Sequence, residues 1–139
     1  DGWDMHKNLE GEMEDIAPPF DRAYAALITD LKQRGMLDTT LVVLATEFGR
    51  KPDYKGGGRG HYPTAFSCAL AGAGIKRGFV YGQTDKLGAH PDKPVSIGEL
   101  HATIGHAAGL PMETPAVTST GRPFHVGGKY NKPIMDLFA

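Results

Sequence analysis

Four side chains of this sequence are of types that bind metal ions, and their spacing could bring them together. Asp4 and His6 are two residues apart, so an extended segment would project both to the same side. Glu47 follows the apolar run 40–46, and His61 follows a run of glycines. Carboxylates and imidazoles are common ligands of divalent cations such as zinc. The candidate metal ligands are therefore Asp4, His6, Glu47 and His61.

Each of these residues also has a simpler interpretation. Asp4 could cap the segment that follows it, and His6 could be an exposed loop residue. Glu47 must reach solvent, pair with a base such as Arg50, or bind a cation, because a lone buried charge is costly. His61 could lie in a flexible surface loop. Residue types and spacing leave both interpretations open.

The stretch GGGRGHYP, residues 56–63, has a composition suited to anion binding. Its glycines allow the backbone to approach a ligand closely, and Tyr62, which precedes a proline, should be extended. Arg59 offers a planar fork of donors that suits phosphate, sulfate or carboxylate. The Gly-x4-Gly-Lys-Ser/Thr pattern of a P-loop is absent from this stretch. Arg59 is therefore the candidate catalytic residue beside the metal ligands.

The remaining histidines and the one cysteine occur in less specific patterns. His101 and His106 are five residues apart on an expected helix, so at least one of them should pack or hydrogen-bond locally. His90 and His125 fall in loops. Cys68 lies in an apolar run and is predicted to be a small buried thiol. A single cysteine excludes an internal disulfide and a thiolate-rich metal site.

A helix and two strands must position the candidate ligands. Apolar side chains at helical spacing predict a helix over 19–34, with prolines suited to its start and Gly35 suited to its end. The runs 40–46 and 65–71 are predicted to be neighbouring strands buried on both faces. Ligands of open α/β sheets sit beyond the carboxyl ends of strands, and Glu47 lies at such an end.

A second helix is predicted over 97–108. Ser96 and Glu99 have the spacing of a capping box, and Gly109 is a natural stop. A short terminal helix over 132–139 should dock through three apolar side chains, those of Ile134, Leu137 and Phe138. Residues 111–133 are rich in turn formers and receive no element. Helices that alternate with buried strands predict an α/β layered architecture.

Length and composition predict one globular domain. The chain has 139 residues, of which 40% are hydrophobic and 22% charged, and this balance argues against disorder. A net charge of −1 gives no electrostatic footprint for nucleic acid. No apolar run approaches the roughly 20 residues that span a bilayer, so no transmembrane segment is expected. The chain begins without an initiator methionine, which is compatible with an upstream leader.

Several longer segments together resemble a known family. They are, in order, GWDMHKN, LVVLATEFGRKP, GRGHYPTAFSCALAGAGIKRGFVYGQTD, PVSIGELHATIGHAAGLP and, at the end, GRPFHVGGK with PIMDLFA. They resemble the C-terminal portion of the bacterial domain of unknown function 1501 family, placed among the alkaline-phosphatase-like and sulfatase-like proteins. The resemblance implies that residues 1–139 form the C-terminal portion of one alkaline-phosphatase-like domain, a layered α/β sheet with flanking helices. The missing N-terminal half of that domain would then be a partner.

The resemblance also implies a site. In phosphatase-type members of that superfamily, an Asp with a nearby His, an acidic residue after an apolar strand and a His after a loop bind metal. These correspond by motif to Asp4, His6, Glu47 and His61. Phe48 stands where the superfamily often has a second ligand, and the Asp4-to-His6 spacing is shorter than in alkaline phosphatases. The superfamily's nucleophile belongs to the N-terminal half.

Two functions are compatible with these features. The first is a metal-dependent hydrolase of phosphate or sulfate esters, with a small anionic ester as substrate. Its divalent metal would be zinc first, with calcium, magnesium or manganese as alternatives, and Arg59 would stabilise the developing charge. The second is a non-catalytic structural or binding component of an exported or envelope assembly. The resemblance further implies export to the periplasm, the cell envelope or the extracellular space.

Overall fold

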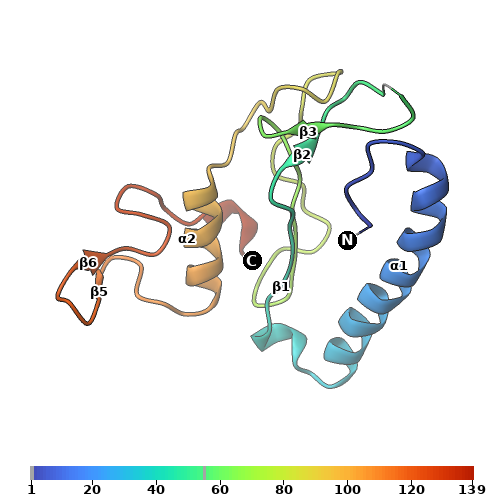
Figure 1. Ribbon diagram of the computed structural model, residues 1–139. Helices are drawn as coiled ribbons and strands as arrows, with labels where there is room; N and C mark the ends of the chain where they lie inside the picture. Colours follow the sequence, from blue (N-terminus) through green and yellow to red (C-terminus); the bar gives the residue numbers. More distant parts are fainter. Residues whose placement is uncertain (1, 55) are drawn as a thin grey trace.

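The computed structural model describes residues 2–54 and 56–139. A long helix, α1, stands on one side of the molecule, and three two-stranded antiparallel sheets and helix α2 follow it in the sequence (Figure 1). The elements are α1 (Leu9–Gln33), η1 (Leu37–Thr39), β1 (Val42–Leu44), β2 (Gly49–Arg50), β3 (His61–Tyr62), β4 (Ala69–Ala71), α2 (Ile97–Ala107), β5 (Ala116–Val117), β6 (Pro123–Phe124) and η2 (Met135–Leu137). The fold is therefore mixed α and β.

Helix α1 begins at Leu9, ten residues before the predicted start. Pro18 and Pro19 lie inside it, so the prediction that prolines open the helix is wrong. The preceding segment is rich in strong helix formers, and Glu10 and Glu12 in the first turn favour the positive end of the helix dipole. These preferences outweigh the backbone hydrogen bonds that the prolines remove. The predicted stop is confirmed, since Gly35 has a left-handed φ of 68° after the last turn.

Strands β1 and β4 pair as predicted, but they are shorter and less buried. They run antiparallel, with Val43 opposite Leu70 in the register. Val43 is 36% exposed and Ala69 is exposed, so the prediction of strands buried on both faces is wrong. Apolar side chains alone do not bury a strand when no second layer covers it. The C-terminal end of β1 leads toward β2 (Figure 1).

Helix α2 begins at the predicted residue and ends at Ala107, one residue before the predicted end. The Ser96 hydroxyl accepts from the Glu99 amide at 3.1 Å, and the Glu99 carboxylate accepts from the Ser96 amide at 2.8 Å. Gly109 follows the helix with a φ of 75°. The predicted terminal helix is a single 3₁₀ turn, η2, and Phe138 beside it packs edge-on against His106 with ring centroids 4.9 Å apart. His106 therefore packs as expected of one of the two helix histidines, but against a residue distant in the sequence rather than a local one.

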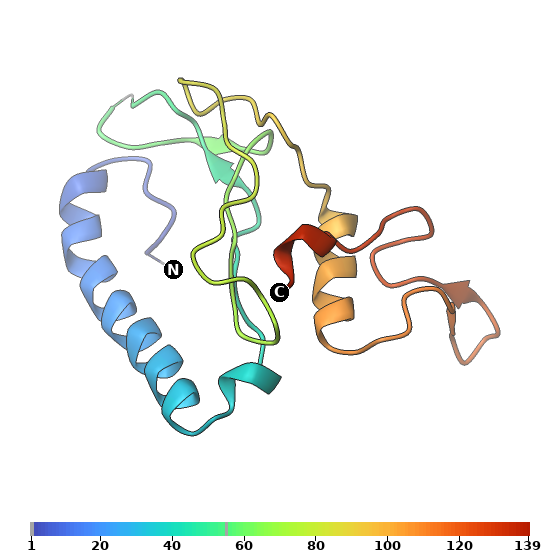
Figure 2. The same cartoon turned by 180° about the vertical axis from the view of Figure 1, so that it is seen from behind.

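Few side chains are fully buried among the described residues. The buried set comprises Met5, Leu31, Ala102 and Thr103. Beyond α2, the β5–β6 hairpin extends away from the rest of the molecule (Figure 2). No helix in the described part of the chain combines the length and apolar character needed to cross a bilayer.

Candidate metal centre

The N-terminal segment is held against the glycine loop by backbone hydrogen bonds. The Arg59 amide donates to the Met5 carbonyl at 3.0 Å, and the Leu9 amide donates to the Gly57 carbonyl at 2.7 Å. The Met5 side chain is only 3% exposed, so it anchors the segment. Its neighbours Asp4 and His6 are exposed. The alternation expected for an extended segment therefore presents Asp4 and His6 on the side opposite the anchor.

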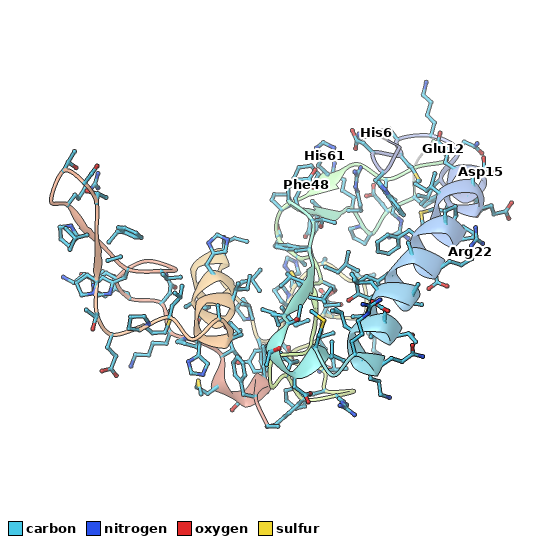
Figure 3. All side chains as sticks on the ribbon, turned by 90° about the horizontal axis from the view of Figure 1, so that it is seen from below. His6, Glu12, Asp15, Arg22, Phe48 and His61 are labelled. Carbon is cyan, nitrogen blue, oxygen red and sulfur yellow. The ribbon has the colours of Figure 1, made fainter. Side chains whose placement is uncertain are left out.

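The β2–β3 hairpin presents a second set of side chains at the same place. Arg50 lies directly opposite His61 in the antiparallel register, so both side chains project from one face of the hairpin. The Phe48 ring lies against the His61 ring, with centroids 4.1 Å apart. Figure 3 shows His61 and Phe48 together at the hairpin, with His6 next to them.

One carboxylate oxygen of Asp4 joins the two segments. Oδ1 of Asp4 lies 2.9 Å from His61 Nε2, 3.1 Å from His6 Nε2 and 2.6 Å from an Arg50 guanidinium nitrogen. The hydrogen bond from His61, followed by that from Arg50 and by the nearby charges of His6 and Arg50, lowers the pKa of Asp4 from 3.8 to about 2. Asp4 is therefore a carboxylate at neutral pH.

Asp4, His6 and His61, which we call the Asp–His–His cluster, have the donor set of a transition-metal site. Their ligand atoms all lie within 4.8 Å of one another. Ligand atoms around one tetrahedral zinc ion are roughly 3.3–3.5 Å apart, close to the 2.9 Å and 3.1 Å separations from Asp4. Two imidazoles and one carboxylate leave a coordination position open, as catalytic zinc sites do. The residues present therefore fit a zinc-type ion.

The other two predicted site residues lie differently. Glu47 is exposed, is absent from the Asp–His–His cluster, and has no ion pair or hydrogen bond within the described ranges 2–54 and 56–139. The alternative pairing of Glu47 with Arg50 is not observed either, because Arg50 contacts Asp4. Arg59 follows the buried Gly58, and its Nε is buried without a hydrogen-bond partner in the described structure.

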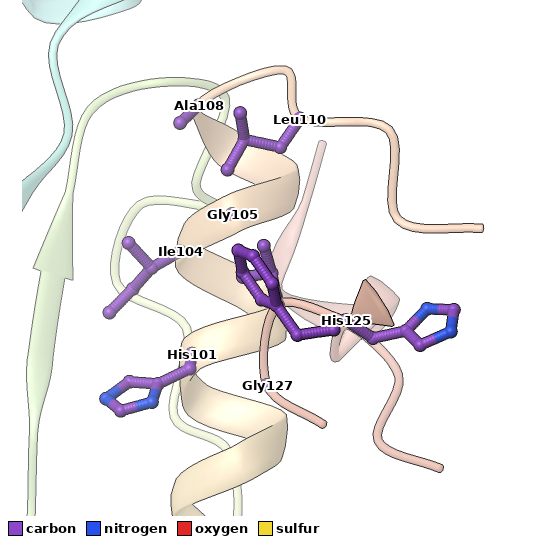
Figure 4. A pocket seen from close by; sticks show the side chains of 9 residues that line it. His101, Ile104, Gly105, Ala108, Leu110, His125 and Gly127 are labelled. Atoms are coloured by element: carbon purple, nitrogen blue, oxygen red, sulfur yellow. The ribbon is translucent and has the colours of Figure 1, made fainter. Parts of the chain in front are cut away.

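A second concave region lies beside α2. His101 and His125 line it together with apolar residues, namely Ile104, Leu110, Phe124 and Val126. The two imidazoles lie on opposite sides of this pocket and point away from each other (Figure 4). None of the described residues that line the pocket is a carboxylate, and these two histidines do not belong to a metal-ligand cluster in that part of the chain.

Cys68 requires a correction. It is exposed and precedes β4, whereas the sequence predicts a buried thiol within a strand. Partial desolvation raises the pKa of the Cys68 thiol above its usual 9.0. A raised pKa keeps the thiol protonated and disfavours a nucleophilic role.

Two residues beside the cluster, Arg50 and Gly58, have roles that the sequence does not predict. The sequence suggests Arg50 only as a partner of Glu47, and it suggests the glycines only as positions where the backbone approaches a ligand. A Cβ at Gly58 would overlap the main chain of His6 and Lys7, so the close contact between the two segments requires glycine there. The signal for Arg50 was its place in a hairpin, since a Gly-Arg pair precedes the loop and a Gly-His pair follows it.

Comparison with known proteins identifies the family and no relative of known function. Searches of curated proteins and of solved structures found no match. The sequence model of the family described as "Protein of unknown function (DUF1501)" matches residues 1–138. That match covers all but the last residue, and the chain therefore belongs to the DUF1501 family.

Proposed function

We propose that the Asp–His–His cluster binds a divalent metal ion and that the chain contributes this centre to a hydrolase of phosphate or sulfate esters. The observation that carries the proposal is the convergence of Asp4, His6 and His61 from two segments more than fifty residues apart in the sequence. Two imidazole ligands favour zinc over calcium or magnesium, which prefer oxygen ligands.

The chain's own residues have distinct roles in this proposal. Asp4, His6 and His61 hold the ion, and the pKa of Asp4, lowered to about 2, keeps that ligand ionised. When bound, the metal supplies Lewis-acid polarisation of an ester oxygen. Arg59 is assigned to the charged oxygens of the ester, which its unpartnered Nε supports. Glu47 stays a predicted ligand, and no residue of this chain is assigned as the nucleophile.

We further propose that the domain is alkaline-phosphatase-like and that its N-terminal half covers part of this chain. The chain has 9966 Å² of accessible surface, whereas a compact monomer of this mass has roughly 7000 Å². Large apolar side chains are exposed, including those of Trp3, Val43, Phe79 and Val80. Hydrogen exchange tests this: amides of β1 and β4 should exchange more slowly in a protein that carries that half, and equal rates would contradict it.

A second function is favoured by one specific contact. Arg50 already neutralises Asp4, with 2.6 Å between the guanidinium and Oδ1, so the cluster can join the N-terminal segment to the hairpin without a metal. This supports a non-catalytic structural component of an exported assembly. Export itself is proposed from the family resemblance alone, and fractionation of cells that express the native gene tests it.

Zinc titration separates the two functions. The chain should bind one zinc ion, and His61→Ala should weaken binding by at least about 10-fold to 100-fold, a range that even outer-shell partners of a metal reach. His101→Ala is the matched control, since His101 is an exposed histidine of α2 outside the cluster. The protein with its native N-terminal half should then hydrolyse 4-nitrophenyl phosphate or sulfate only with metal. No zinc binding by the unsubstituted chain would favour the structural function.

A further inference from the structure

Arg50 is fixed beside the Asp–His–His cluster by contacts that do not depend on Asp4. Its guanidinium donates to the Arg59 carbonyl at 3.2 Å and to the Trp3 carbonyl at 3.3 Å, and it lies 5.8 Å from the centre of the Phe48 ring. Its side chain is 28% exposed, against 60% for Asp4. Arg50 therefore stays at the cluster whatever Asp4 binds.

This position makes Arg50 compete with a metal ion for one atom. The guanidinium and both imidazoles contact the same oxygen, Oδ1 of Asp4. Asp4 and Arg50 together carry no net charge, so a divalent ion would leave a net charge of about +2 where two cations repel each other. The Arg50 N–H that now donates to Asp4 would also lose its acceptor. An oxyanion with two negative charges satisfies both conditions, because it offsets the charge and accepts from the planar fork.

We infer that Arg50 couples metal binding to oxyanion binding, so that a tetrahedral dianion bridges the metal and the Arg50 guanidinium. The inference rests on the proposed metal centre and adds the substrate class that it selects, a phosphate monoester, whose phosphate group carries two negative charges whereas the group of a sulfate ester carries one. Coupling is reciprocal, so the anion strengthens metal binding by the same factor as the metal strengthens anion binding. Arg50, rather than the loop residue Arg59 alone, then determines anion specificity.

Zinc titrations of the chain at constant ionic strength test this coupling. Micromolar zinc is titrated in chloride, in sulfate and in dilute phosphate, and affinity is read by calorimetry. Zinc should bind roughly tenfold more tightly with sulfate or phosphate than with chloride, within the range typical of coupled sites. Tighter binding with only one of the two anions identifies which group the centre prefers.

Substitution of Arg50 supplies the second arm. Arg50→Gln should bind zinc roughly tenfold more tightly than the unsubstituted chain in chloride and should lose the anion dependence. Arg22→Gln, which removes an equal charge from an exposed position on α1, should behave like the unsubstituted chain (Figure 3). Arg50→Lys keeps the charge and removes the fork, so it should retain weak zinc binding in chloride with a smaller anion effect. It replaces Arg50→Gln if that variant does not fold.

The outcomes distinguish this inference from the proposed function. Zinc binding that is equal in all anions and unchanged in Arg50→Gln overturns the coupling and leaves the metal centre intact. Absence of zinc binding in the unsubstituted chain and in Arg50→Gln, in every anion, overturns the metal centre and the coupling with it.

Discussion

The Asp–His–His cluster and the pocket beside α2 each contain two histidines, but their environments differ. His6 and His61 meet on a carboxylate, with both Nε2 atoms within 3.1 Å of Asp4 Oδ1. His101 and His125 lie on opposite sides of a largely apolar pocket (Figure 4). The first pair is brought together by segments far apart in the sequence, whereas the second pair, one histidine on α2 and one after β6, lines a pocket without meeting. Residue type alone therefore does not predict which histidines form a site.

Backbone pairing accounts for the difference. At the cluster, two hydrogen bonds join residues 5–9 to the glycine loop, and the β2–β3 register sets His61 opposite Arg50. At the pocket, α2 is stabilised by its own cap and by the buried Thr103. Within the described residues, no strand pairing brings His101 and His125 together. The cluster should therefore depend on backbone pairing between distant segments, and α2 on its own cap together with side-chain contacts to Asn131, Ile134 and Phe138.

Among the variants that test this comparison, Gly58→Ala should lose the most stability. Its Cβ would overlap the main chain of His6 and Lys7, and a backbone collision of this kind costs about 3 kcal/mol, at the upper end of overpacking effects. Urea unfolding should show that loss, and zinc binding should be lost with it. Gly60→Ala is the control, because its Cβ would meet only the flexible Lys51 side chain at 3.5 Å. Equal stability of the two variants would contradict the account.

Thr103→Val tests the α2 region. The fully buried Thr103 hydroxyl donates to the Glu99 carbonyl at 2.7 Å and accepts from the Ile134 amide at 3.0 Å. Valine leaves that amide without a partner, which should cost about 2 kcal/mol. Thr103→Ser, which keeps the hydroxyl, should cost less than Thr103→Val. Zinc affinity should not change in either variant, and a loss of it would show that the two regions are coupled.

Ser96→Ala should have a smaller effect, which includes loss of the hydrogen bond that the Ser96 hydroxyl donates to Asn131 Oδ1 at 3.0 Å. It removes the N-cap acceptor of α2, and such losses cost about 1 kcal/mol. The control is Ser119→Ala, in an exposed turn, which should change stability by less than about 0.5 kcal/mol. Circular dichroism during urea unfolding measures both. A Ser96→Ala variant as stable as the control would mean that the cap contributes nothing.

Local signals in the sequence predicted local structure well. The capping box, Gly35 and Gly109 behave as expected because each acts within one helix turn. The start of α1 was not predicted, since the Asn8 N-cap has a left-handed φ of 48° and makes no side-chain capping bond. The burial of β1 was overestimated because burial depends on what covers a strand, which no apolar run specifies.

The candidate site was predictable in part. The two-residue spacing of Asp4 and His6 indicated a shared side, and the histidine after the glycines lies beside them. Arg50 was not found, because its role depends on a cross-strand register that the loop length does not fix. The place of Glu47 after an apolar run predicts a ligand, but its exposed side chain lies outside the cluster. Contacts between distant segments thus account for what the sequence did not predict.

The smallest effect concerns pH, and it distinguishes distant from local partners. The pKa of Asp4 is lowered to about 2, first by His61 and then by Arg50, whereas the pKa of Glu99 is lowered from 4.5 by the backbone and side chain of Ser96. Depressed pKa values stabilise the fold above the unfolded-state pKa, and this stabilisation is lost as pH falls through the folded-state value. Both carboxylates should therefore contribute at pH 6 and lose their contributions on acidification.

Asp4→Asn and Glu99→Gln, studied with a metal chelator, test this. Asp4→Asn should lower the urea midpoint at pH 6, and the difference from the unsubstituted chain should shrink between pH 4 and pH 2, the interval from the ordinary pKa of 3.8 to about 2. Glu99→Gln should show a similar loss as pH falls below about 4.5. In an Arg50→Gln background, Asp4→Asn should lower the urea midpoint by less, because Arg50 is one of the partners of Asp4. The effect of Glu99→Gln should stay the same, because Glu99 is partnered by Ser96 and not by Arg50. If both differences decrease together, the two regions are not independent, and the contrast between distant and local stabilisation is wrong.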